Sequence, residues 1–338
     1  MSTAAEKLTK KDFASDQEVR WCPGCGDYAI LSAAQQAFAE LGVARENFVV
    51  VSGIGCAARF PYYLNTYGFH TIHGRAPSVA TGIKVTNPDL SVWIVTGDGD
   101  ALSIGGNHII HLMRRNLDVN VLLFDNRIYG LTKGQYSPTS EFGKKTKSSP
   151  FGSVDRPFNP LALALGAGAT FVARSIDVHS PHLKRTIAEA HGHAGTSFVQ
   201  IYQNCNIFND GAFAALRDKG SRPDAVVELE HGKPLVFGKD GDRGIRMKGP
   251  FEPEIVRLGK EFSERDLIVH DECGPLGYLM TLAQMAPPDF PVPIGVLRRV
   301  ERPCFEREVR GQIQSITEKK GAGDLDAVLR SGTTWTVA

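Results

Sequence analysis

Short apolar segments alternate with longer segments of helical periodicity along the first two thirds of the chain. Strands are predicted by four nearly continuous apolar runs, at residues 47–53, 91–96, 119–124 and 197–202. Helices are predicted where apolar residues recur every three or four positions, over residues 28–41, 105–116 and 180–191, and in a segment with Pro77 in its first turn that ends near Thr86. Apolar strands separated by helices are typical of an α/β fold with a mostly parallel sheet and helices on both faces.

The same pattern predicts how the chain is divided. Residues 1–20 are polar and are predicted to form an N-terminal tail, followed by one α/β domain over residues 21–231. Within that domain, the Ser-, Thr-, Lys-, Gly- and Pro-rich residues 130–154 predict a long loop. The hydrophilic, Gly-rich residues 232–249 predict a linker to a C-terminal region, 250–338. In that region we expect a helix and a short strand, near residues 253–262 and at 267–270.

Composition and net charge give no indication of a membrane-spanning or nucleic-acid-binding protein, and they do not identify a ligand. The chain has 338 residues, 42% hydrophobic and 22% charged, which is ordinary for a soluble protein. Its formal net charge of +1 gives no reason to expect nucleic acid or a membrane surface as a partner. No apolar segment approaches the ~20 residues of a membrane span, and the polar start lacks the apolar core of a signal peptide. We therefore expect a cytoplasmic protein.

A candidate metal site follows two of the predicted strands. Gly97-Asp98-Gly99-Asp100 comes directly after one apolar run, and Asn126 follows the next. Carboxylate and amide oxygens are hard ligands that suit Mg²⁺, and glycines let the backbone approach phosphate oxygens. Both side chains would emerge at the same edge of a parallel sheet. The pattern predicts a divalent metal that clamps a diphosphate, although Asp98 taken alone is more typical of a turn or helix cap.

The six cysteines indicate metal or cluster binding, because disulfides are rare in the cytosol. Cys22 and Cys25 form a close CxxC pair, whereas Cys56 and Cys205 each follow a predicted strand. These segments would meet at one edge of the sheet, and four thiolates so arranged suit a 4Fe–4S cluster. A zinc site with four cysteine ligands is the alternative, because it needs the same number of thiolates. The other two thiols are expected to be buried or incidental: Cys273 and Cys304.

Together these constellations resemble the β subunits of the 2-oxoacid:ferredoxin oxidoreductases. The Gly-Asp-Gly motif followed by Asn126 is similar to the diphosphate signature of thiamine-dependent enzymes, and the four cysteines set this family apart from other thiamine enzymes. The resemblance covers about residues 15–250 strongly and the C-terminal part more loosely. The matching segments are WCPGCGDYAIL (21–31), SGIGCAARF (52–60), HGRAPSVATGIK (73–84), GDGDALSIGGNHIIHLMRRN (97–116), DNRIYGLTKGQYSPT (125–139) and YQNCNIFND (202–210).

The resemblance implies three cofactors: thiamine diphosphate, Mg²⁺ and a 4Fe–4S cluster. The cluster ligands implied are Cys22, Cys25, Cys56 and Cys205. The magnesium ligands implied are the side chains of Asp98 and Asn126 and the carbonyl of Ile128. The residues that would line or contact thiamine diphosphate are Ile54, Gly55, Cys56, Ala57, His73, Gly74, Arg75, Ala76, Gly99, Asp100, Gly130 and Leu131.

Three side chains are implied to act in catalysis: Lys133, His73 and Arg75. Lys133 would meet the 2-oxoacid carboxylate, because a nearby cation orients that group. His73 and Arg75 can donate to phosphate oxygens or to the substrate. Without the family motif, Lys133 would be interpreted as a solvated loop lysine, and His73 and Arg75 as a capping pair before the Pro77 helix.

The implied reaction is the oxidative decarboxylation of a 2-oxoacid with coenzyme A to acyl-CoA and CO₂, with electrons passing through the cluster to ferredoxin. Run in reverse, the same parts perform reductive carboxylation, as in carbon fixation by the reductive TCA cycle. 2-Oxoglutarate is favoured over pyruvate because the long region after Gly249 resembles the 2-oxoglutarate type. The pyrimidine-binding domain of thiamine enzymes has no counterpart here, so an α subunit is implied, in an α2β2 heterotetramer.

Two other functions fit the residues. A non-oxidative thiamine decarboxylase would leave the four cysteines without a role, and a zinc-stabilised, non-enzymatic subunit would bind no thiamine. Iron and sulfide analysis separates these hypotheses. Three lysines of the long loop are candidates for docking acidic ferredoxin, although a solvated loop is the simpler interpretation: Lys144, Lys145 and Lys147.

Overall fold

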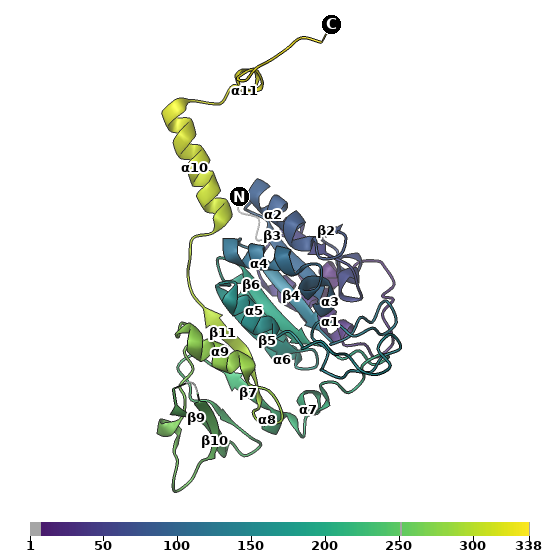
Figure 1. Cartoon of the computed structure of the whole chain (residues 1–338), viewed down its shortest axis with the longest axis vertical. Coiled ribbons are helices and arrows are strands. Elements are labelled where there is room, and N and C mark those ends of the chain that lie inside the picture. The colour runs from purple at the N-terminus through teal and green to yellow at the C-terminus, as the bar shows by residue number, and fades with distance from the viewer. Residues whose placement is uncertain (1–7, 251, 338) are drawn as a thin grey trace.

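An eight-stranded sheet forms the centre of the molecule in a computed structural model that describes residues 8–250 and 252–337 (Figure 1). The strands lie in the order β2-β1-β3-β4-β6-β5-β11-β7. Neighbouring strands are parallel, except that β11 pairs antiparallel with β5. The strands are β1 (Phe48–Ser52), β2 (Tyr67–His70), β3 (Ser91–Gly97), β4 (Asn120–Asp125), β5 (Phe171–Ile176), β6 (Ser197–Tyr202), β7 (Val226–Leu229) and β11 (Val292–Arg299).

Both faces of this sheet are covered by helices. Val49 and Val51 of β1 face a core that also holds residues of α2, α4, α5 and α9, whereas Phe48 and Val50 face a core shared with α1 and α6. Because both faces are buried, the strands appear in the sequence as continuous apolar runs. The longer helices are α1 (Asp27–Glu40), α2 (Ala76–Thr86), α4 (Gly106–Arg115), α5 (Pro160–Gly166), α6 (Ser180–His191), α9 (Leu276–Gln284) and α10 (Phe305–Lys320). The predicted fold class is confirmed.

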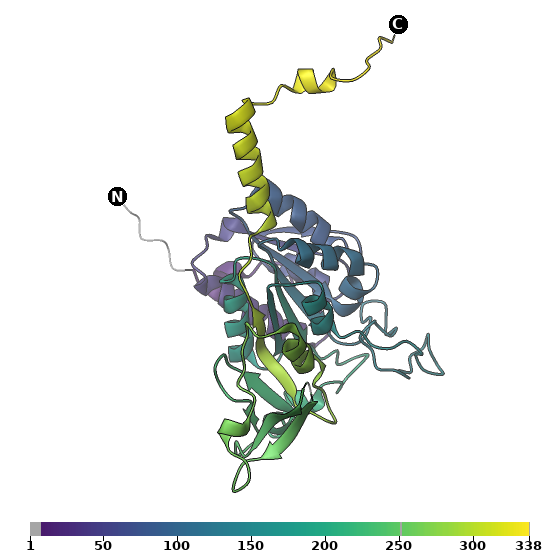
Figure 2. The same ribbon diagram turned by 60° about the vertical axis from the view of Figure 1, so that its left-hand side comes forward.

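Shorter helices and turns connect these elements. They are η1 (Lys10–Phe13), η2 (Arg45–Asn47), η3 (Ala57–Tyr63), α3 (Asp98–Leu102), α7 (Ala214–Arg217), α8 (Arg222–Ala225), η4 (Glu264–Asp266) and α11 (Leu325–Leu329). Residues 130–154 form a loop, as predicted, with turns and two isolated bridges, Tyr129–Gln135 and Thr146–Ser149. Together with neighbouring loops, it projects from the body of the molecule in Figure 2.

The predicted linker, residues 232–249, contains two strands instead. β8 (Val236–Phe237) and β9 (Arg243–Gly249) pair antiparallel, and β10 (Glu252–Arg257) pairs antiparallel with β9. The helix expected near 253–262 is therefore wrong. The pairing is stabilised across the two strands by an ion pair between Arg246 and Glu254 and by the burial of Ile245. Helical periodicity depends on spacings of three or four residues, so it does not report pairs of residues that face each other on neighbouring strands.

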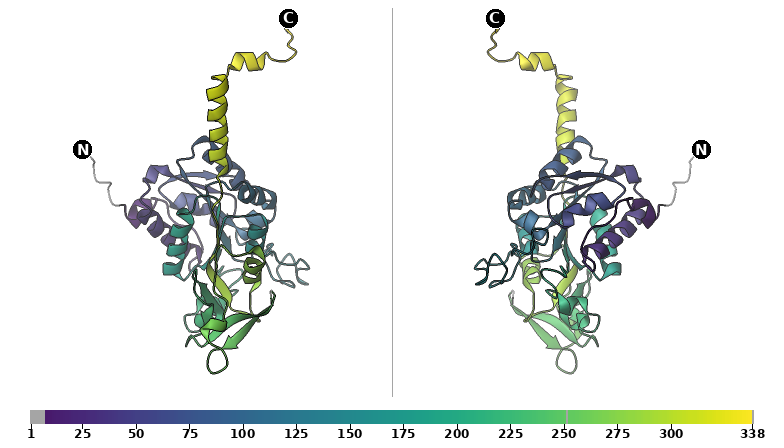
Figure 3. Two further views of the ribbon diagram at one scale, coloured as in Figure 1. Left: turned by 90° about the vertical axis from the view of Figure 1, so that its left-hand side faces the viewer. Right: turned by 90° about the vertical axis from the view of Figure 1, so that its right-hand side faces the viewer.

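The region after residue 249 also completes the main sheet, because β11 inserts between β5 and β7. The C-terminal region is thus partly built into the same core as the residues before it. The short strand expected at residues 267–270 is reduced to a single bridge between Val269 and Pro234. In all views α10 and α11 extend away from the body, at the end opposite the three-stranded sheet (Figures 2 and 3). Among the described residues, no helix combines the length and apolar character needed to cross a membrane.

Part of the predicted N-terminal tail packs on the core. The Phe13 side chain is fully buried, with its ring centroid 5.9 Å from that of Phe38 and 5.3 Å from that of Phe48. A single apolar anchor in a polar segment gives no periodicity, so the sequence pattern alone predicts a free tail. Residues 1–7 of the predicted tail lie outside the described residues.

Candidate active site

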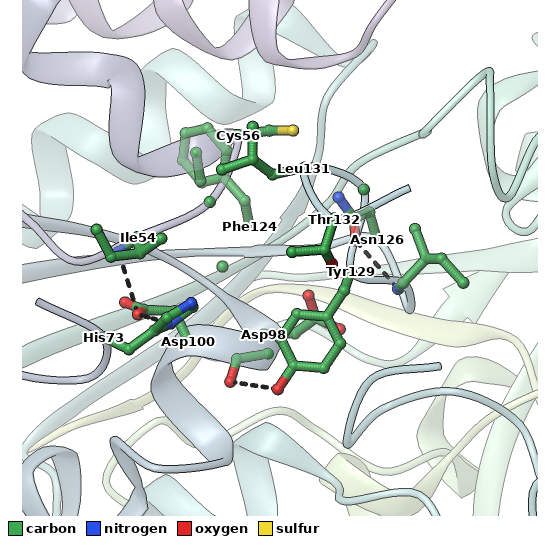
Figure 4. A pocket seen from close by; sticks show the side chains of 16 residues that line it. Ile54, Cys56, His73, Asp98, Asp100, Phe124, Asn126, Tyr129, Leu131 and Thr132 are labelled. Atoms are coloured by element: carbon green, nitrogen blue, oxygen red, sulfur yellow. Dashed lines mark hydrogen bonds and ion pairs between the residues drawn. The ribbon is translucent and has the colours of Figure 1, made fainter. Parts of the chain in front are cut away.

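A cavity of about 50 Å³ lies at the carboxyl ends of β1, β3 and β4, where their loops meet (Figure 4). The predicted residues that line it are Ile54, Gly55, Cys56, Ala57, His73, Asp98, Gly99, Asp100, Asn126, Ile128, Gly130 and Leu131. Three of the residues predicted to contact thiamine diphosphate are not in its lining: Gly74, Arg75 and Ala76. Four lining residues were not predicted: Gly97, Phe124, Tyr129 and Thr132.

Asp98 begins α3 and is held by hydroxyl groups from the long loop. Ser137 Oγ and Thr139 Oγ1 each donate to Asp98 Oδ2 at 2.5 Å, and Thr139 Oγ1 also lies 2.9 Å from Asp125 Oδ1. Burial, with the Asp125 carboxylate nearby, raises the pKa of Asp98 well above its usual range. A buried carboxylate with a raised pKa is stabilised by a cation, so Asp98 is well placed as a metal ligand. Sequence reasoning missed the two hydroxyls because they lie in a loop without a regular pattern.

The Asn126 side chain is fixed from both ends of its amide. Its Oδ1 accepts from the backbone N–H of Ile128 at 3.1 Å, and its Nδ2 donates to Gln203 Oε1 at 2.8 Å. Between them, Arg127 has a φ of +57°, which turns the chain so that Asn126 and Ile128 stay on the same side. Both residues line the cavity that Asp98 also lines.

The carboxylate of Asp100 joins three segments around the cavity. Its Oδ1 accepts from the backbone N–H groups of Ile54 at 3.1 Å and Gly74 at 2.8 Å, and lies 2.8 Å from His73 Nδ1. Its Oδ2 accepts from Thr96 Oγ1 at 2.7 Å. Asp100 therefore acts mainly as an anchor for the loops that follow β1 and β2, and Figure 4 shows its side chain beside that of His73.

Gly99 has no room for a side chain. A Cβ built there would lie 2.2 Å from the Tyr129 ring, whose hydroxyl donates to the Gly99 carbonyl at 3.0 Å. The close approach brings the loop after β4 against the start of α3. Glycine at this position is therefore required by packing, whether or not it also contacts a phosphate.

The three predicted catalytic residues occupy different settings. His73 lines the cavity with its side chain 43% exposed. Arg75 lies outside the cavity lining, with its guanidinium near the carbonyls of His73 and Ile104. Lys133 has a φ of +74° in a tight turn and lines a second, neighbouring cavity instead. The two cavities share a wall that includes Cys56, Asn126, Gly130 and Leu131.

The second cavity, of about 230 Å³, is lined by all four predicted cluster cysteines: Cys22, Cys25, Cys56 and Cys205. A Cβ on Gly130 would lie 3.5 Å from the sulfur of Cys205 and 3.6 Å from that of Cys56. Burial raises the pKa of the Cys56 thiol to about 12 and also raises that of Cys25. Within residues 8–250 and 252–337, no three Cys, His, Asp or Glu side chains are grouped closely enough to hold a single metal ion.

Other polar groups surround these cysteines. Trp21 Nε1 donates to the Cys56 carbonyl at 2.8 Å, and Gln203 Nε2 lies 3.3 Å from the Cys25 sulfur. Asp27 is 1% exposed, and burial raises its pKa to about 7. Sequence reasoning named none of these three residues, although two of them flank the CxxC pair. The remaining two cysteines differ: Cys304 is buried, whereas Cys273 is exposed.

Comparisons with known proteins identify the family. Residues 53–201 match the family model described as thiamine pyrophosphate enzyme, C-terminal TPP binding domain. The chain is 50% identical over 331 residues to the 2-oxoglutarate oxidoreductase subunit KorB of Mycobacterium tuberculosis, covering 97% of this chain and 88% of that protein. It is also 50% identical over 190 residues to the 2-oxoacid:ferredoxin oxidoreductase 1 subunit beta of Aeropyrum pernix, covering 56% of this chain and 60% of that one.

A solved structure agrees with these matches. The 2-oxoglutarate:ferredoxin oxidoreductase from Magnetococcus marinus, with 2-oxoglutarate, coenzyme A and succinyl-CoA bound, superposes with a TM-score of 0.76 and 33% sequence identity. The superposition covers 97% of each chain. The chain therefore belongs to the family of the 2-oxoacid:ferredoxin oxidoreductase β subunits, as its motifs predicted, and it contains the thiamine diphosphate-binding domain of that family.

Proposed function

We propose that this chain is the β subunit of an enzyme that oxidatively and reversibly decarboxylates 2-oxoglutarate with coenzyme A and passes electrons to ferredoxin. The observation that carries this proposal is the pair of adjoining cavities. One is lined by oxygen donors and glycines suited to a metal and a diphosphate, and the other by four cysteines. Because the cavities share a wall, a cofactor held in the first would lie next to a cluster held in the second.

The first cavity suits magnesium and the diphosphate of thiamine. Asp98, Asn126 and the Ile128 carbonyl offer the hard oxygen donors that Mg²⁺ prefers. Burial and the neighbouring Asp125 carboxylate raise the pKa of Asp98, and a bound cation would favour its charged form. When bound, thiamine diphosphate supplies the electron sink for decarboxylation. This chain would hold the diphosphate and metal, with Gly99 and Gly130 allowing close backbone approach.

The second cavity suits a 4Fe–4S cluster better than zinc. A zinc ion gathers four sulfurs at about 2.3 Å from one point, whereas a 4Fe–4S cluster places the same four thiolates around a larger group. Thiols spread around a cavity of about 230 Å³ favour a larger inorganic group. Metal binding would also convert the buried, protonated thiols to thiolates. This donor set favours an oxidative enzyme over a non-oxidative thiamine decarboxylase, which needs no cluster.

Substrate binding is assigned to the cationic side chains near the common wall. Lys133 would attract the 2-oxoacid carboxylate from the cluster side of the wall, where it lines the second cavity. His73, oriented by Asp100, would donate to a phosphate oxygen or to the substrate from the other side. Arg75 lines neither cavity, so it would have to reach a phosphate oxygen or the substrate from outside them. 2-Oxoglutarate is favoured over pyruvate because two of the matched proteins are named for it.

A partner α subunit would complete the site. A volume of about 50 Å³ is far below the roughly 300 Å³ or more of an ordinary small-molecule site, so this chain encloses only one end of a cofactor. Exposed apolar side chains lie on η3, on the edge strand β2 and in the loops near His73: Tyr62, Tyr67, Phe69, Ile72 and Ile104. An apolar surface of this kind indicates a protein interface. We propose an α2β2 assembly with the pyrimidine-binding domain on the α subunit.

Ferredoxin docking is assigned to the long loop after β4. Lys145 and Lys147 are exposed there, whereas Lys144 is half-buried against Asn209 and Glu141. The first two are therefore the better candidates for meeting an acidic ferredoxin.

Anaerobic co-production of this chain with its α subunit tests the proposal. We expect iron, sulfide, thiamine and magnesium in the purified complex, and ferredoxin reduction that needs both 2-oxoglutarate and coenzyme A. Zinc in place of iron would overturn the cluster assignment. Decarboxylation without an electron acceptor would favour the non-oxidative alternative, and a preference for pyruvate would overturn the substrate.

A further inference from the structure

Gln203 lines the second cavity and contacts both Asn126, in the wall common to the two cavities, and Cys25. Its Oε1 accepts from Asn126 Nδ2 at 2.8 Å, and its Nε2 lies 3.3 Å from the sulfur of Cys25. The same Nε2 donates to the Asn204 carbonyl at 2.6 Å. One amide group therefore connects the proposed magnesium ligand to a proposed cluster ligand, with no residue in between.

The fold fixes this amide in one orientation. Gln203 directly follows β6, is 1% exposed, and its backbone N–H donates to the Asp125 carbonyl at 3.0 Å. Gly26 leaves the space for it, because a Cβ there would lie 3.0 Å from Gln203 Cγ. The neighbours also set which end is oxygen, since Asn126 presents a donor and Asn204 an acceptor. An apolar side chain of similar length would leave both the donor and the acceptor without a partner.

We propose that Gln203 is a positioning residue that holds Asn126 in place for magnesium and donates a hydrogen bond to the cluster ligand Cys25. This inference rests on the proposed function. Gln203 Oε1 accepts from Asn126 Nδ2 and so fixes the orientation of the Asn126 amide. The amide oxygen is thereby kept in the position in which it would bind magnesium. By donating to a ligand sulfur, it stabilises the extra negative charge of the reduced cluster and so raises the reduction potential. The binding of the cofactor and the potential of its electron acceptor thus depend on the same side chain.

Two substitutions separate the two contacts. Gln203→Glu keeps an oxygen that accepts from Asn126 but removes the N–H donor beside Cys25. Gln203→Met has a similar length and removes both. We expect both variants to lower the midpoint potential of the cluster, measured by an EPR-monitored redox titration of the full complex. Only Gln203→Met should weaken the binding of magnesium and thiamine diphosphate, by about 10- to 100-fold, measured by quenching of tryptophan fluorescence.

Gln35→Met is the matched control. Gln35 is also a buried glutamine, but its Nε2 donates to the Tyr63 carbonyl at 3.3 Å, and it lines neither cavity. We expect it to change neither the potential nor the affinity. A role in packing alone would lower the melting temperature of Gln203→Met while leaving the potential of both Gln203 variants unchanged, and that result would overturn the inference.

Iron, sulfide and thiamine analysis of the unaltered complex comes first. If the cluster and thiamine are absent there, the proposed function has failed, and the inference fails with it. If both are present and the Gln203 variants behave like the control, the inference alone has failed.

Discussion

The hydroxyl of Thr139 donates a 2.5 Å hydrogen bond to the buried carboxylate of Asp98. Thr139 belongs to the long loop after β4, whereas Asp98 begins the short helix after β3. The loop is therefore part of the site, because it holds the orientation of the carboxylate that the motif predicts as a magnesium ligand.

Thr139→Val should weaken magnesium binding without changing the metal ligands themselves. The valine is similar in shape, but it removes the hydroxyl shared by Asp98 and Asp125. We expect the affinity for magnesium and thiamine diphosphate to fall about tenfold, as for other lost partners of metal ligands. Titration of the metal in the presence of thiamine diphosphate measures this. Thr81→Val, which removes only a hydrogen bond to the Pro77 carbonyl within α2, is the control. Equal affinities for the two variants would contradict the assigned role.

Gly99→Ala should damage the site through packing. The added Cβ would lie 2.2 Å from the Tyr129 ring, so the loop after β4 must move. We expect a loss of about 1–3 kcal/mol in the free energy of unfolding together with loss of thiamine diphosphate binding. Denaturant unfolding and a binding titration measure the two effects. Gly82→Ala is the matched control, because Gly82 lies in the middle of α2 with nothing within 4 Å of an added Cβ. It should stabilise the protein by up to about 1 kcal/mol.

The sequence predicted the elements that carry the motifs more accurately than the region beyond them. Strands such as β3 and β4 are apolar on both faces, so a local pattern is enough to find them. β9 and β10 depend on cross-strand partners such as Arg246 and Glu254, which no local period reports. For the same reason, β11 could not be assigned to the main sheet, since its neighbours β5 and β7 lie far away in the sequence.

The candidate site divides in a similar way. Asp98, Asn126 and the four cysteines were predicted from their positions after the strands, because parallel strands end at one edge of a sheet. They line two adjoining cavities in the structure. The groups that orient them could not be predicted. Ser137 and Thr139 lie in an irregular loop, and Gln203 is one of several amides beside Cys205. Their roles depend on hydrogen bonds to residues that are distant in the sequence and close only in the folded chain.

His182 should make the protein less stable as the pH falls below the usual histidine range. Burial lowers the pKa of His182 from its usual 6.5 to about 3, and its Nδ1 lies 2.8 Å from Ser175 Oγ. Since the unfolded chain takes up the proton first, this stability is present above pH 6.5 and is lost progressively from there down to about pH 3. At about pH 5 the loss from His182 alone is about 2 kcal/mol.

Urea unfolding of the wild type and His182→Gln at about pH 7.5 and pH 5 tests this expectation. The variant should lose less stability than the wild type between the two conditions. Thr81→Val, which changes no titratable group, should keep the wild-type pH dependence. An unchanged pH dependence in His182→Gln would show that His182 is not the group that takes up the proton.

Phe69→Glu should separate the folding of this chain from its assembly. Phe69 is 48% exposed on the edge strand β2, next to the loop that carries His73. A carboxylate there costs little in the isolated chain, which already leaves the ring in contact with water, but it would be buried without a partner in an apolar interface. We expect normal melting of the chain alone and loss of the α subunit on co-purification, measured by size-exclusion chromatography. Val269→Glu places the same charge at an exposed apolar residue beside the three-stranded sheet, remote from β2, and should leave the complex intact. If Phe69→Glu also co-purifies with the α subunit, the subunit that completes the site does not dock on β2.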